Sequence, residues 1–325
     1  MIFFQEKLLA KIDIAKLNQI LSNYGNFKVV SFHSQSGWQN LTLKVKTYVK
    51  TFVLRIYRTG NFEKINFSLD VIEYLAKSNF KVQNLAKPAN NSRIIRVKIG
   101  KSSHFAVLFE YIDGKIYNFL TAKQLEVLGG LSAKLHQKLE QFDRTYPQIG
   151  KISTLQIFRN VNSQLTARFE NESNILKLWQ SNKLPIFENI YSQKKFLGKT
   201  QLIHGDLAPS NILFGKNKIL AILDFDDLKI APRIWDLVNF VGNYSQTIKG
   251  WGQNEKTLSV LAHLVKGYKK NNNLEVEEEK LIPFLLRLWF FKKIVWAQGE
   301  SAKKYRQKWA KEVMSWCVEA LEEKF

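Results

Sequence analysis

The spacing of hydrophobic residues changes about a third of the way along the chain. Between residues 27 and 112, short runs rich in β-branched and aromatic residues alternate with polar positions, as strands do. Beyond residue 113, apolar residues recur every three or four positions, which predicts helices. The elements expected in the first part are helices over residues 5–24 and around 69–76, and strands at 29–32, 41–45, 52–57, 94–99 and 105–109.

The second part is expected to be helical over residues 125–139, 155–180 and 255–270. Residues 202–230 differ, because two short apolar runs flank the turn-forming sequence Gly215-Lys216-Asn217-Lys218, which predicts a β-hairpin. The whole pattern predicts an α+β protein with a cleft between two lobes. We assign residues 1–112 to a small lobe with an antiparallel sheet, and residues 113–325 to a larger, mainly helical lobe.

Composition places the chain among ordinary globular proteins, with 325 residues, 45% of them hydrophobic and 24% charged. Its single cysteine, Cys317, excludes an intramolecular disulfide and any metal site built from several cysteines. A lone cysteine favours a reducing compartment, so we expect a cytoplasmic protein. The longest apolar stretch, residues 282–296, is broken by Arg287, Lys292 and Lys293, which indicates an amphipathic or buried helix instead of a membrane span.

The net charge of +21 has two interpretations. It could serve an anionic partner such as nucleic acid, a membrane surface or a phosphorylated ligand. It could also be a lysine-rich, solvated surface. The excess is spread over both parts of the chain without a concentrated basic tail, which favours the second interpretation.

Three polar residues in the 202–230 segment suit phosphoryl transfer to a hydroxyl group. This reaction needs a carboxylate beside the attacking hydroxyl, and hard oxygen ligands for Mg²⁺. Asp206 can act as the base, and Asn211 and Asp224 can hold the metal. Pro209 lies between Asp206 and Asn211 and favours a tight loop over a regular helix. Asp and Asn are also common as cap and turn residues, but the full ordered set around two apolar strands favours catalysis.

This segment resembles the catalytic core of the aminoglycoside phosphotransferase and choline kinase superfamily, which is related to the protein kinases. The similarity lies in His204-Gly205-Asp206, the loop that ends in Asn211, and the strand end Asp224-Phe225-Asp226. The resemblance implies a protein kinase-like fold, with ATP and Mg²⁺ as cofactors. It also implies that Asp236, at the start of a following helix, braces the catalytic loop, and that His204 is mainly structural.

The resemblance extends more weakly toward the N-terminus. Residues 36–40, with Gly37 and Asn40, are similar to the family's nucleotide-positioning loop. Arg55 stands where family members carry the basic residue that grips the α- and β-phosphates. Residues 109–112 resemble the segment between the lobes, where backbone groups of Glu110 and Ile112 would bind adenine.

One position departs from the family pattern. The helix that usually supplies a glutamate partner for the phosphate-gripping base has Ser68 at that place. Asp70 or Glu63 could substitute for the glutamate, or Arg55 could be held in another way. Which residue pairs with Arg55 decides how the expected nucleotide site is organised.

The expected reaction is transfer of the ATP γ-phosphate to a hydroxyl of a small molecule such as an amino alcohol, an aminoglycoside or a sugar derivative. A protein serine or threonine is the second choice of acceptor. A non-catalytic scaffold that binds nucleic acid or an acidic partner is the alternative from another class. Several aromatic residues could line a site for a quaternary amine or simply form the helical core; they are Trp235, Tyr244, Trp251, Trp289 and Trp296.

Overall fold

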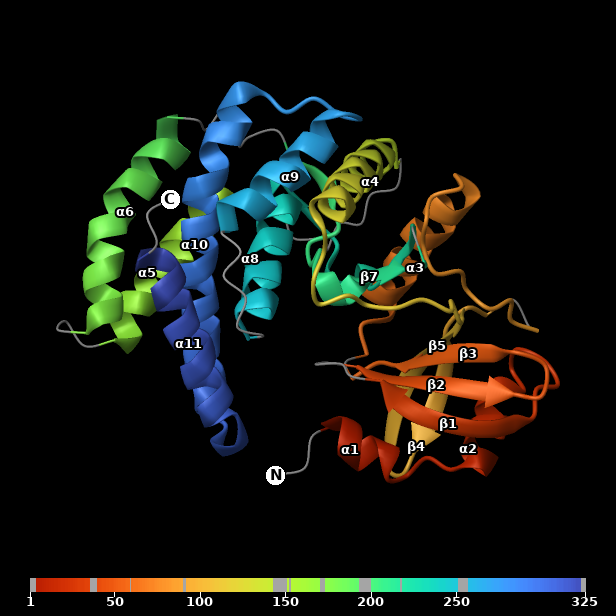
Figure 1. Cartoon of the computed structure of the whole chain (residues 1–325). Coiled ribbons are helices and arrows are strands. Elements are labelled where there is room, and N and C mark those ends of the chain that lie inside the picture. The colour runs from red at the N-terminus through yellow and green to blue at the C-terminus, as the bar shows by residue number, and fades with distance from the viewer. Residues whose placement is uncertain are drawn as a thin grey trace. The chain divides into compact units, whose positions relative to one another are not determined.

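A computed structural model gives the fold (Figure 1). It describes residues 4–35, 40–58, 60–89, 92–142, 151, 153–169, 173–192, 200–216, 218–250 and 257–322. The chain divides into two compact units, which are treated separately below. Unit 1 comprises Met1–Lys115 and Phe214–Asp226, and unit 2 comprises Ile116–Leu213 and Asp227–Phe325.

Unit 1 is built on a five-stranded antiparallel sheet with the strand order β1-β2-β3-β5-β4. The strands lie where the alternating pattern predicts them, although β5 begins earlier, directly after the turn at Gly100, whose φ is +59°. The bounds are β1 Val29–Gln35, β2 Leu41–Thr47, β3 Thr51–Ile56, β4 Ile95–Ile99 and β5 Ser102–Glu110.

Strand alternation decides which side chains of β3 enter the core. Phe52, Leu54 and Ile56 are fully buried in a cluster on one face of the sheet. Because successive side chains point to opposite faces, Val53 and Arg55 lie on the other face. The sheet therefore places Arg55 away from the main apolar cluster.

The N-terminal helical segment differs from the prediction of one helix over residues 5–24. It forms α1 (Phe4–Leu9) and α2 (Ile14–Leu21), because Asp13 is a helix N-cap and its carboxylate accepts a hydrogen bond from the Lys16 amide at 2.7 Å. Both helices contribute to the apolar cluster under the sheet. The helix expected around residues 69–76 is confirmed as α3 (Phe62–Lys77).

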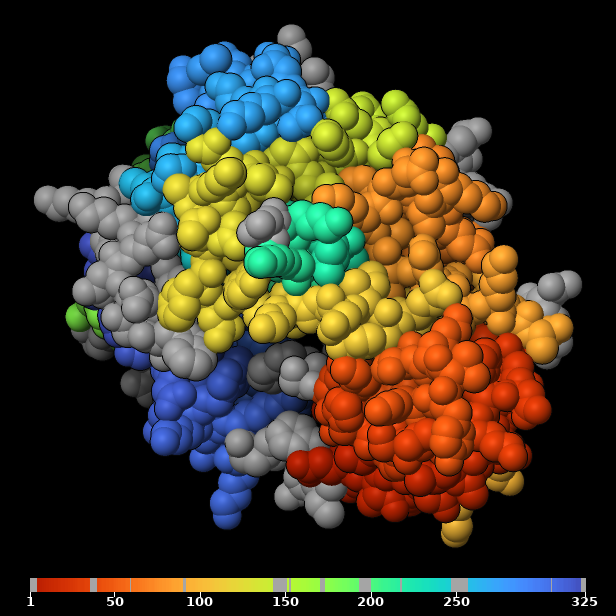
Figure 2. All heavy atoms as spheres, turned by 45° about the vertical axis from the view of Figure 1, so that its right-hand side comes forward, coloured from red at the N-terminus to blue at the C-terminus, as the bar shows by residue number. Residues whose placement is uncertain are grey.

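The predicted hairpin is confirmed as a two-stranded sheet of β7 (Ile212–Phe214) and β8 (Ile219–Ile222). Within unit 1, Phe214 exchanges two backbone hydrogen bonds of 2.8 Å with Lys115, which follows β5. The space-filling view shows this segment, in teal, against the yellow segment that contains Lys115 (Figure 2). The Ile222 amide likewise donates to the Lys81 carbonyl at 2.8 Å.

Unit 2 is mainly helical, and a short sheet pairs β6 (Gln201–Ile203) with β9 (Lys229–Ala231). The predicted helix over 155–180 is interrupted and forms two helices, since α5 ends at Arg168 and α6 begins at Asn174. The helices are α4 Ala122–Glu140, α5 Thr154–Arg168, α6 Asn174–Ser192, α8 Ile234–Gly250, α9 Thr257–Lys269, α10 Val276–Ser301 and α11 Gln307–Glu322. Within the described residues, no helix has the length and apolar character needed to cross a membrane.

Two glycines allow α4 and α9 to approach closely. A Cβ atom built on Gly129 would lie 1.9 Å from the Leu264 carbonyl oxygen, and one built on Gly267 would lie 1.9 Å from the Glu126 carbonyl oxygen. Both obstacles are backbone atoms, which cannot rotate away. The helix pair therefore depends on the absence of side chains at these two positions.

We expect Gly129→Ala and Gly267→Ala each to lower the free energy of unfolding by about 1–3 kcal/mol, because the added methyl group separates α4 from α9. Urea denaturation measures the effect. The matched control is Gly299→Ala in α10, where a new Cβ meets only the flexible end of Arg168 at 3.1 Å. Loss of stability in this control equal to that of the two variants would contradict the packing argument.

Candidate active site

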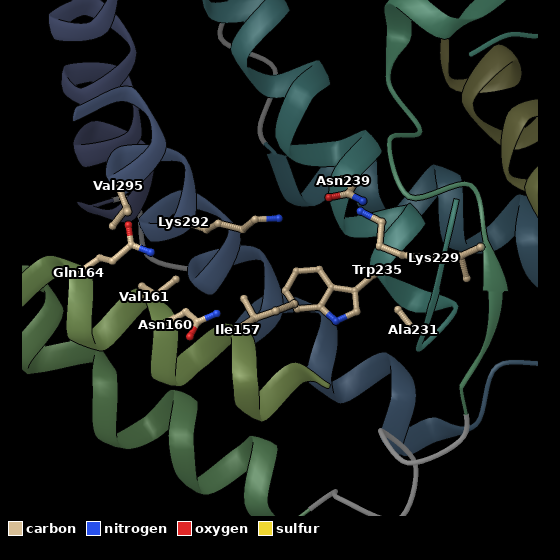
Figure 3. Close-up of a pocket in the computed structure, with 11 residues that line it drawn as sticks. Ile157, Asn160, Val161, Gln164, Lys229, Ala231, Trp235, Asn239, Lys292 and Val295 are labelled. Carbon is tan, nitrogen blue, oxygen red and sulfur yellow. The ribbon is translucent and has the colours of Figure 1, made fainter. Parts of the chain in front are cut away.

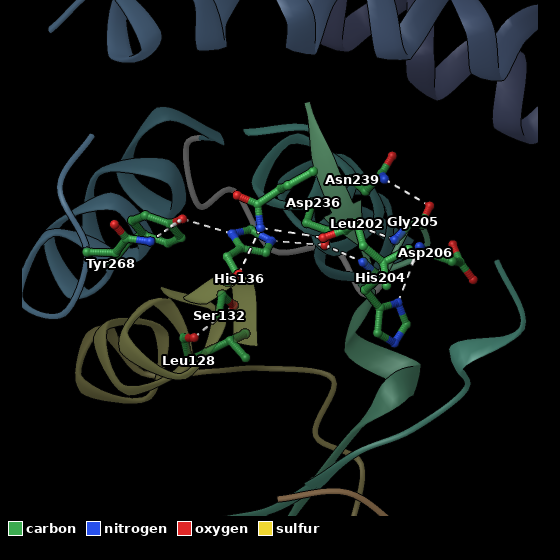
Figure 4. Close-up of polar contacts among 12 residues, drawn as sticks. Leu128, Ser132, His136, Leu202, His204, Gly205, Asp206, Asp236, Asn239 and Tyr268 are labelled. Carbon is green, nitrogen blue, oxygen red and sulfur yellow. Dashed lines mark hydrogen bonds and ion pairs between the residues drawn. The ribbon is translucent and has the colours of Figure 1, made fainter. Parts of the chain in front are cut away.

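The loop between β6 and β7 is anchored by a single buried carboxylate. Asp236, in the first turn of α8, is fully buried and accepts hydrogen bonds from the backbone amides of His204 at 2.9 Å and Gly205 at 2.8 Å (Figure 4). The bracing role that the family resemblance implies for Asp236 is confirmed. The first turn of α8 thus holds the loop at His204 and Gly205, the two residues that directly precede Asp206.

Histidine side chains complete this anchor. His136 of α4 is fully buried, and its Nε2 donates to Asp236 at 3.1 Å while its Nδ1 hydrogen-bonds the Tyr268 hydroxyl at 2.8 Å. His204 is also fully buried, and its Nδ1 accepts from the Asp206 amide at 3.3 Å. Both histidines therefore serve to hold the loop, and for His204 this agrees with the structural role that the family resemblance implies.

The charge of Asp236 is favoured in the folded protein. Burial by itself raises the pKa of its carboxyl, but the hydrogen bond from His136, the charge interactions with His136 and His204, and the Gly205 amide outweigh burial. The net effect is a pKa below the ordinary aspartate value. The ionised form is the one that accepts hydrogen bonds from two amides and a ring at once.

Gly205 is required by geometry. Its φ of +83° lies in the left-handed region, and a Cβ atom at this position would lie 2.0 Å from the Asp227 carbonyl oxygen and 2.2 Å from Lys229 Cε. Its own carbonyl accepts a hydrogen bond of 3.1 Å from the side-chain amide of Asn239. Both backbone groups of Gly205, the residue before Asp206, are therefore held by hydrogen bonds: its amide by Asp236 and its carbonyl by Asn239.

Within unit 2, the loop brings Asp206 and Asn211 together. Pro209 begins a short 3₁₀ turn, Pro209–Asn211, and the Asn211 side-chain amide donates to the Asp206 carbonyl at 2.9 Å. This hydrogen bond uses the nitrogen of the amide and leaves its oxygen as a possible ligand. The Asp206 side chain is partly exposed, as a base that must reach a substrate has to be.

Unit 1 holds the other predicted metal ligand in an unusual conformation. Asp224 has a φ of +64°, which non-glycine residues seldom adopt and which clusters at functional sites. Its carboxylate forms an ion pair of 2.9 Å with Arg55, and Asp226 forms another of 3.1 Å with the same Arg55 nitrogen. Burial opposes the Arg55 charge, but the two carboxylates raise its pKa above the ordinary value.

These ion pairs show which residues hold Arg55 in the absence of a glutamate at position 68. Ser68 is buried and its hydroxyl donates to the Lys64 carbonyl of its own helix, while Asp70 pairs with Arg93 at 2.9 Å. Asp70 is therefore not the substitute partner. Arg55 is held by the strand-end aspartates, Asp224 and Asp226, and the sequence did not predict Asp226 as a partner of Arg55.

The remaining predicted nucleotide-site residues differ in their contacts. Asn40 donates to Asp226 at 2.9 Å and accepts from the Arg58 amide at 3.1 Å, which fixes the start of β2. The backbone groups of Glu110 are engaged, since the amide donates to Asn84 and the carbonyl accepts from Gln83, both at 2.9 Å. The backbone of Ile112 makes no hydrogen bond to any described residue, and Gly37 lies outside the described residues.

The oxygen donors fit a hard divalent ion, which takes only one or two ligands from protein. Asn211 offers an amide oxygen and Asp224 a carboxylate, and in the described part of the chain no cluster of three or more His, Cys, Asp or Glu side chains offers a competing metal site. A metal bound through Asn211 and Asp224 stays a prediction, as do the roles of Asp206 and Arg55.

A pocket of about 230 Å³ opens in unit 2 (Figure 3). Its walls come from α5, β6, β9, α8 and α10. The sequence predicted no function for its two lysines: Lys292 was noted only as a break in an apolar stretch, and Lys229 carried no signal. The described residues that line it are Ile157, Asn160, Val161, Gln164, Ile203, Lys229, Ala231, Trp235, Asn239, Lys292 and Val295.

The aromatic residues considered for a quaternary-amine site are mostly core residues. Tyr244 and Trp289 are buried, and Trp289 donates to Asn239 at 3.1 Å. Trp235 lines the pocket, but its ring nitrogen donates to Thr154 at 3.1 Å. Trp296 is 40% exposed and lies under the Lys293 ammonium, and Trp251 is outside the described residues.

A family model of the phosphotransferase enzyme family matches residues 33–271, which are most of the chain and include Asp206, Asn211 and Asp224. The chain belongs to the phosphotransferase enzyme family. It is therefore an enzyme, a small-molecule phosphotransferase. The kinase-like fold predicted from the sequence is confirmed.

Individual relatives are distant. The homoserine kinase of Zymomonas mobilis is 22% identical over 264 residues, which are 77% of this chain and 75% of the relative. A microcompartment-associated aminopropanol kinase has a similar structure, with a TM-score of 0.75, 18% identity and 95% of each chain covered. An amicoumacin kinase in complex with AMP-PNP and Ca²⁺ gives a TM-score of 0.73 at 16% identity, over 97% of this chain and 96% of the other.

We expect Asp236→Asn to lower the free energy of unfolding by about 2 kcal/mol, because a buried amide of the loop loses its acceptor. The loss should shrink at acid pH. The folded pKa of Asp236 is below its unfolded value, so its contribution is present above about pH 4 and is lost as pH falls through the folded pKa. Urea denaturation at several pH values, with the exposed Asp113→Asn as control, measures the difference. An equal loss at every pH would contradict this account.

Proposed function

We propose that the chain is an ATP-dependent kinase that phosphorylates a hydroxyl group of a small molecule in the cytoplasm, with Asp206 as the catalytic base. The observation that carries this proposal is the anchored loop, in which Asp236 fixes the two residues before Asp206. The partly exposed carboxylate of Asp206 lies close enough to the unit 2 pocket for its charge to act on Lys292. A small acceptor in that pocket would have its hydroxyl next to the base.

In the proposed step, Asp206 accepts the proton of the acceptor hydroxyl. The acceptor oxygen forms a bond to the γ-phosphorus of ATP, and the bond from that phosphorus to the bridging oxygen breaks. ADP leaves with the electron pair, and the product is a phosphate monoester. The base mainly orients the hydroxyl, because phosphoryl transfer depends on positioning and on neutralising charge.

Other residues of the chain would bind ATP. Arg55 carries the positive charge suited to the phosphates, and its ion pairs with Asp224 and Asp226 hold it without the usual helix glutamate. Asn211 and Asp224 would hold a divalent ion such as Mg²⁺, which, when bound, neutralises charge on the phosphates. The backbone groups of Ile112, which make no hydrogen bond to any described residue, would suit adenine.

Asp206→Ala should reduce kcat by about 100- to 10,000-fold, because the acceptor hydroxyl loses the group that orients it and takes its proton. Affinity for ATP should stay close to that of the wild type, since Asp206 is not assigned to the nucleotide. Coupled ADP release, with calorimetry of nucleotide binding, separates the two effects. Glu188→Ala removes an exposed carboxylate from α6 and serves as the control. Unchanged turnover in Asp206→Ala would refute the assignment.

Arg55→Met should weaken ATP binding about tenfold or more, because it removes a charged donor to the phosphates and leaves two carboxylates nearby. The KM for the acceptor should change much less. Arg96→Met is the matched control, because Arg96 lies exposed on β4 of the same sheet and contacts the Phe105 ring. Equal effects of the two substitutions would count against the role of Arg55.

A further inference from the structure

The unit 2 pocket is positively charged. Lys229 from β9 and Lys292 from α10 line it, and none of the described lining residues is an aspartate or glutamate. The other polar groups are neutral amides, which can donate hydrogen bonds: Asn160, Gln164 and Asn239. In Figure 3 the Lys292 side chain extends from its helix toward Asn239 and Trp235.

Both ammonium groups belong to the surroundings of Asp206. Lys229 Cε lies 2.2 Å from the position of a Cβ atom on Gly205, so the Lys229 side chain passes directly beside the residue before the base. Lys292 is close enough to Asp206 and Asp227 for their charges to raise its pKa. A ligand that contacts the two lysines would therefore also lie near Asp206.

Neither lysine is neutralised by an ion pair with a described carboxylate. Lys266 of α9 and Lys270, which directly follows this helix, show the contrast, since each forms an ion pair with Glu126. Crowding of the Lys292 ammonium by protein, with repulsion from Lys229 and Lys293, lowers its pKa to about 8 against the opposing effect of Asp206 and Asp227. Lys292 is exposed and Lys229 is half-buried, so both side chains are open to a ligand, and an anion bound between them would be attracted by both charges.

We propose that the acceptor carries an oxyanion, a carboxylate or a phosphate, in addition to its hydroxyl, and that Lys229 and Lys292 bind this group. The proposal rests on the proposed kinase function and names the class of its substrate. A volume of about 230 Å³ suits a molecule of a few carbon atoms. Polycationic acceptors are repelled by the same two charges.

Calorimetry without nucleotide tests the proposal separately from catalysis. The probes are homoserine, which carries a carboxylate, glycerol 3-phosphate, which carries a phosphate, and aminopropanol, which has an amine and a hydroxyl but no oxyanion. At least one of the first two should bind the wild-type protein at least about tenfold more tightly than aminopropanol. Whichever binds identifies the oxyanion as a carboxylate or a phosphate.

Lys229→Met and Lys292→Met should each weaken binding of the preferred probe about tenfold or more, whereas Lys→Arg at either position should retain most of the affinity. Lys280→Met is the control, because Lys280 is an exposed lysine on the same helix as Lys292. Binding of the preferred probe should weaken as pH rises through about 8, because Lys292 then loses its proton.

Stronger binding of aminopropanol than of both anionic probes would overturn the proposal, and so would absence of binding by both at millimolar concentration. Equal affinities in the Met variants and in Lys280→Met would do the same. These outcomes are independent of turnover. If an anionic probe binds through the two lysines but no phosphate is transferred to it from ATP, the proposed reaction fails while the anion site stands.

Discussion

The carboxylate of Asp236 is fully buried in the interior of unit 2, and the geometry of the candidate active-site loop depends on it. Its carboxylate accepts from two consecutive loop amides and from His136, so both oxygens are satisfied without water. His136 is held in turn by Tyr268 of α9. The loop is consequently tied to the close contact of α4 and α9, which exists only because Gly129 and Gly267 have no side chains.

Much of the fold and part of the site were predictable from local sequence. The strands of unit 1 follow from period-two alternation, and the loop follows from the order of His204, Asp206 and Asn211 around a proline. The break between α1 and α2 was missed because its apolar spacing continues across Asp13, whose capping role is visible only from its hydrogen bond. The pocket lysines, Lys229 of β9 and Lys292 of α10, are more than 60 residues apart in the sequence, and no local pattern joins such positions.

The nucleotide side of the site shows how a missing residue can be replaced by nearby ones. A helix glutamate is absent at Ser68, and the strand-end aspartates hold Arg55 instead. One of them, Asp224, is also the predicted metal ligand, and its left-handed backbone shows that the strand end is constrained for more than sheet pairing. Arg55 and the predicted metal ligand Asp224 therefore belong to one charge network, so a substitution of either changes the charge around the other.

The tight packing at Gly205 constrains Lys229, one of the two lysines proposed to bind the acceptor, more than it constrains Lys292. The Lys229 side chain packs directly against Gly205, where a Cβ atom would clash. The position of the Lys229 ammonium therefore depends on the position of the loop. Lys292 projects from a long helix and has no such restriction. Substitutions on the pocket face of α10 would therefore alter the proposed acceptor site without disturbing the loop. Substitutions of Lys229 in β9 would also change the packing against Gly205.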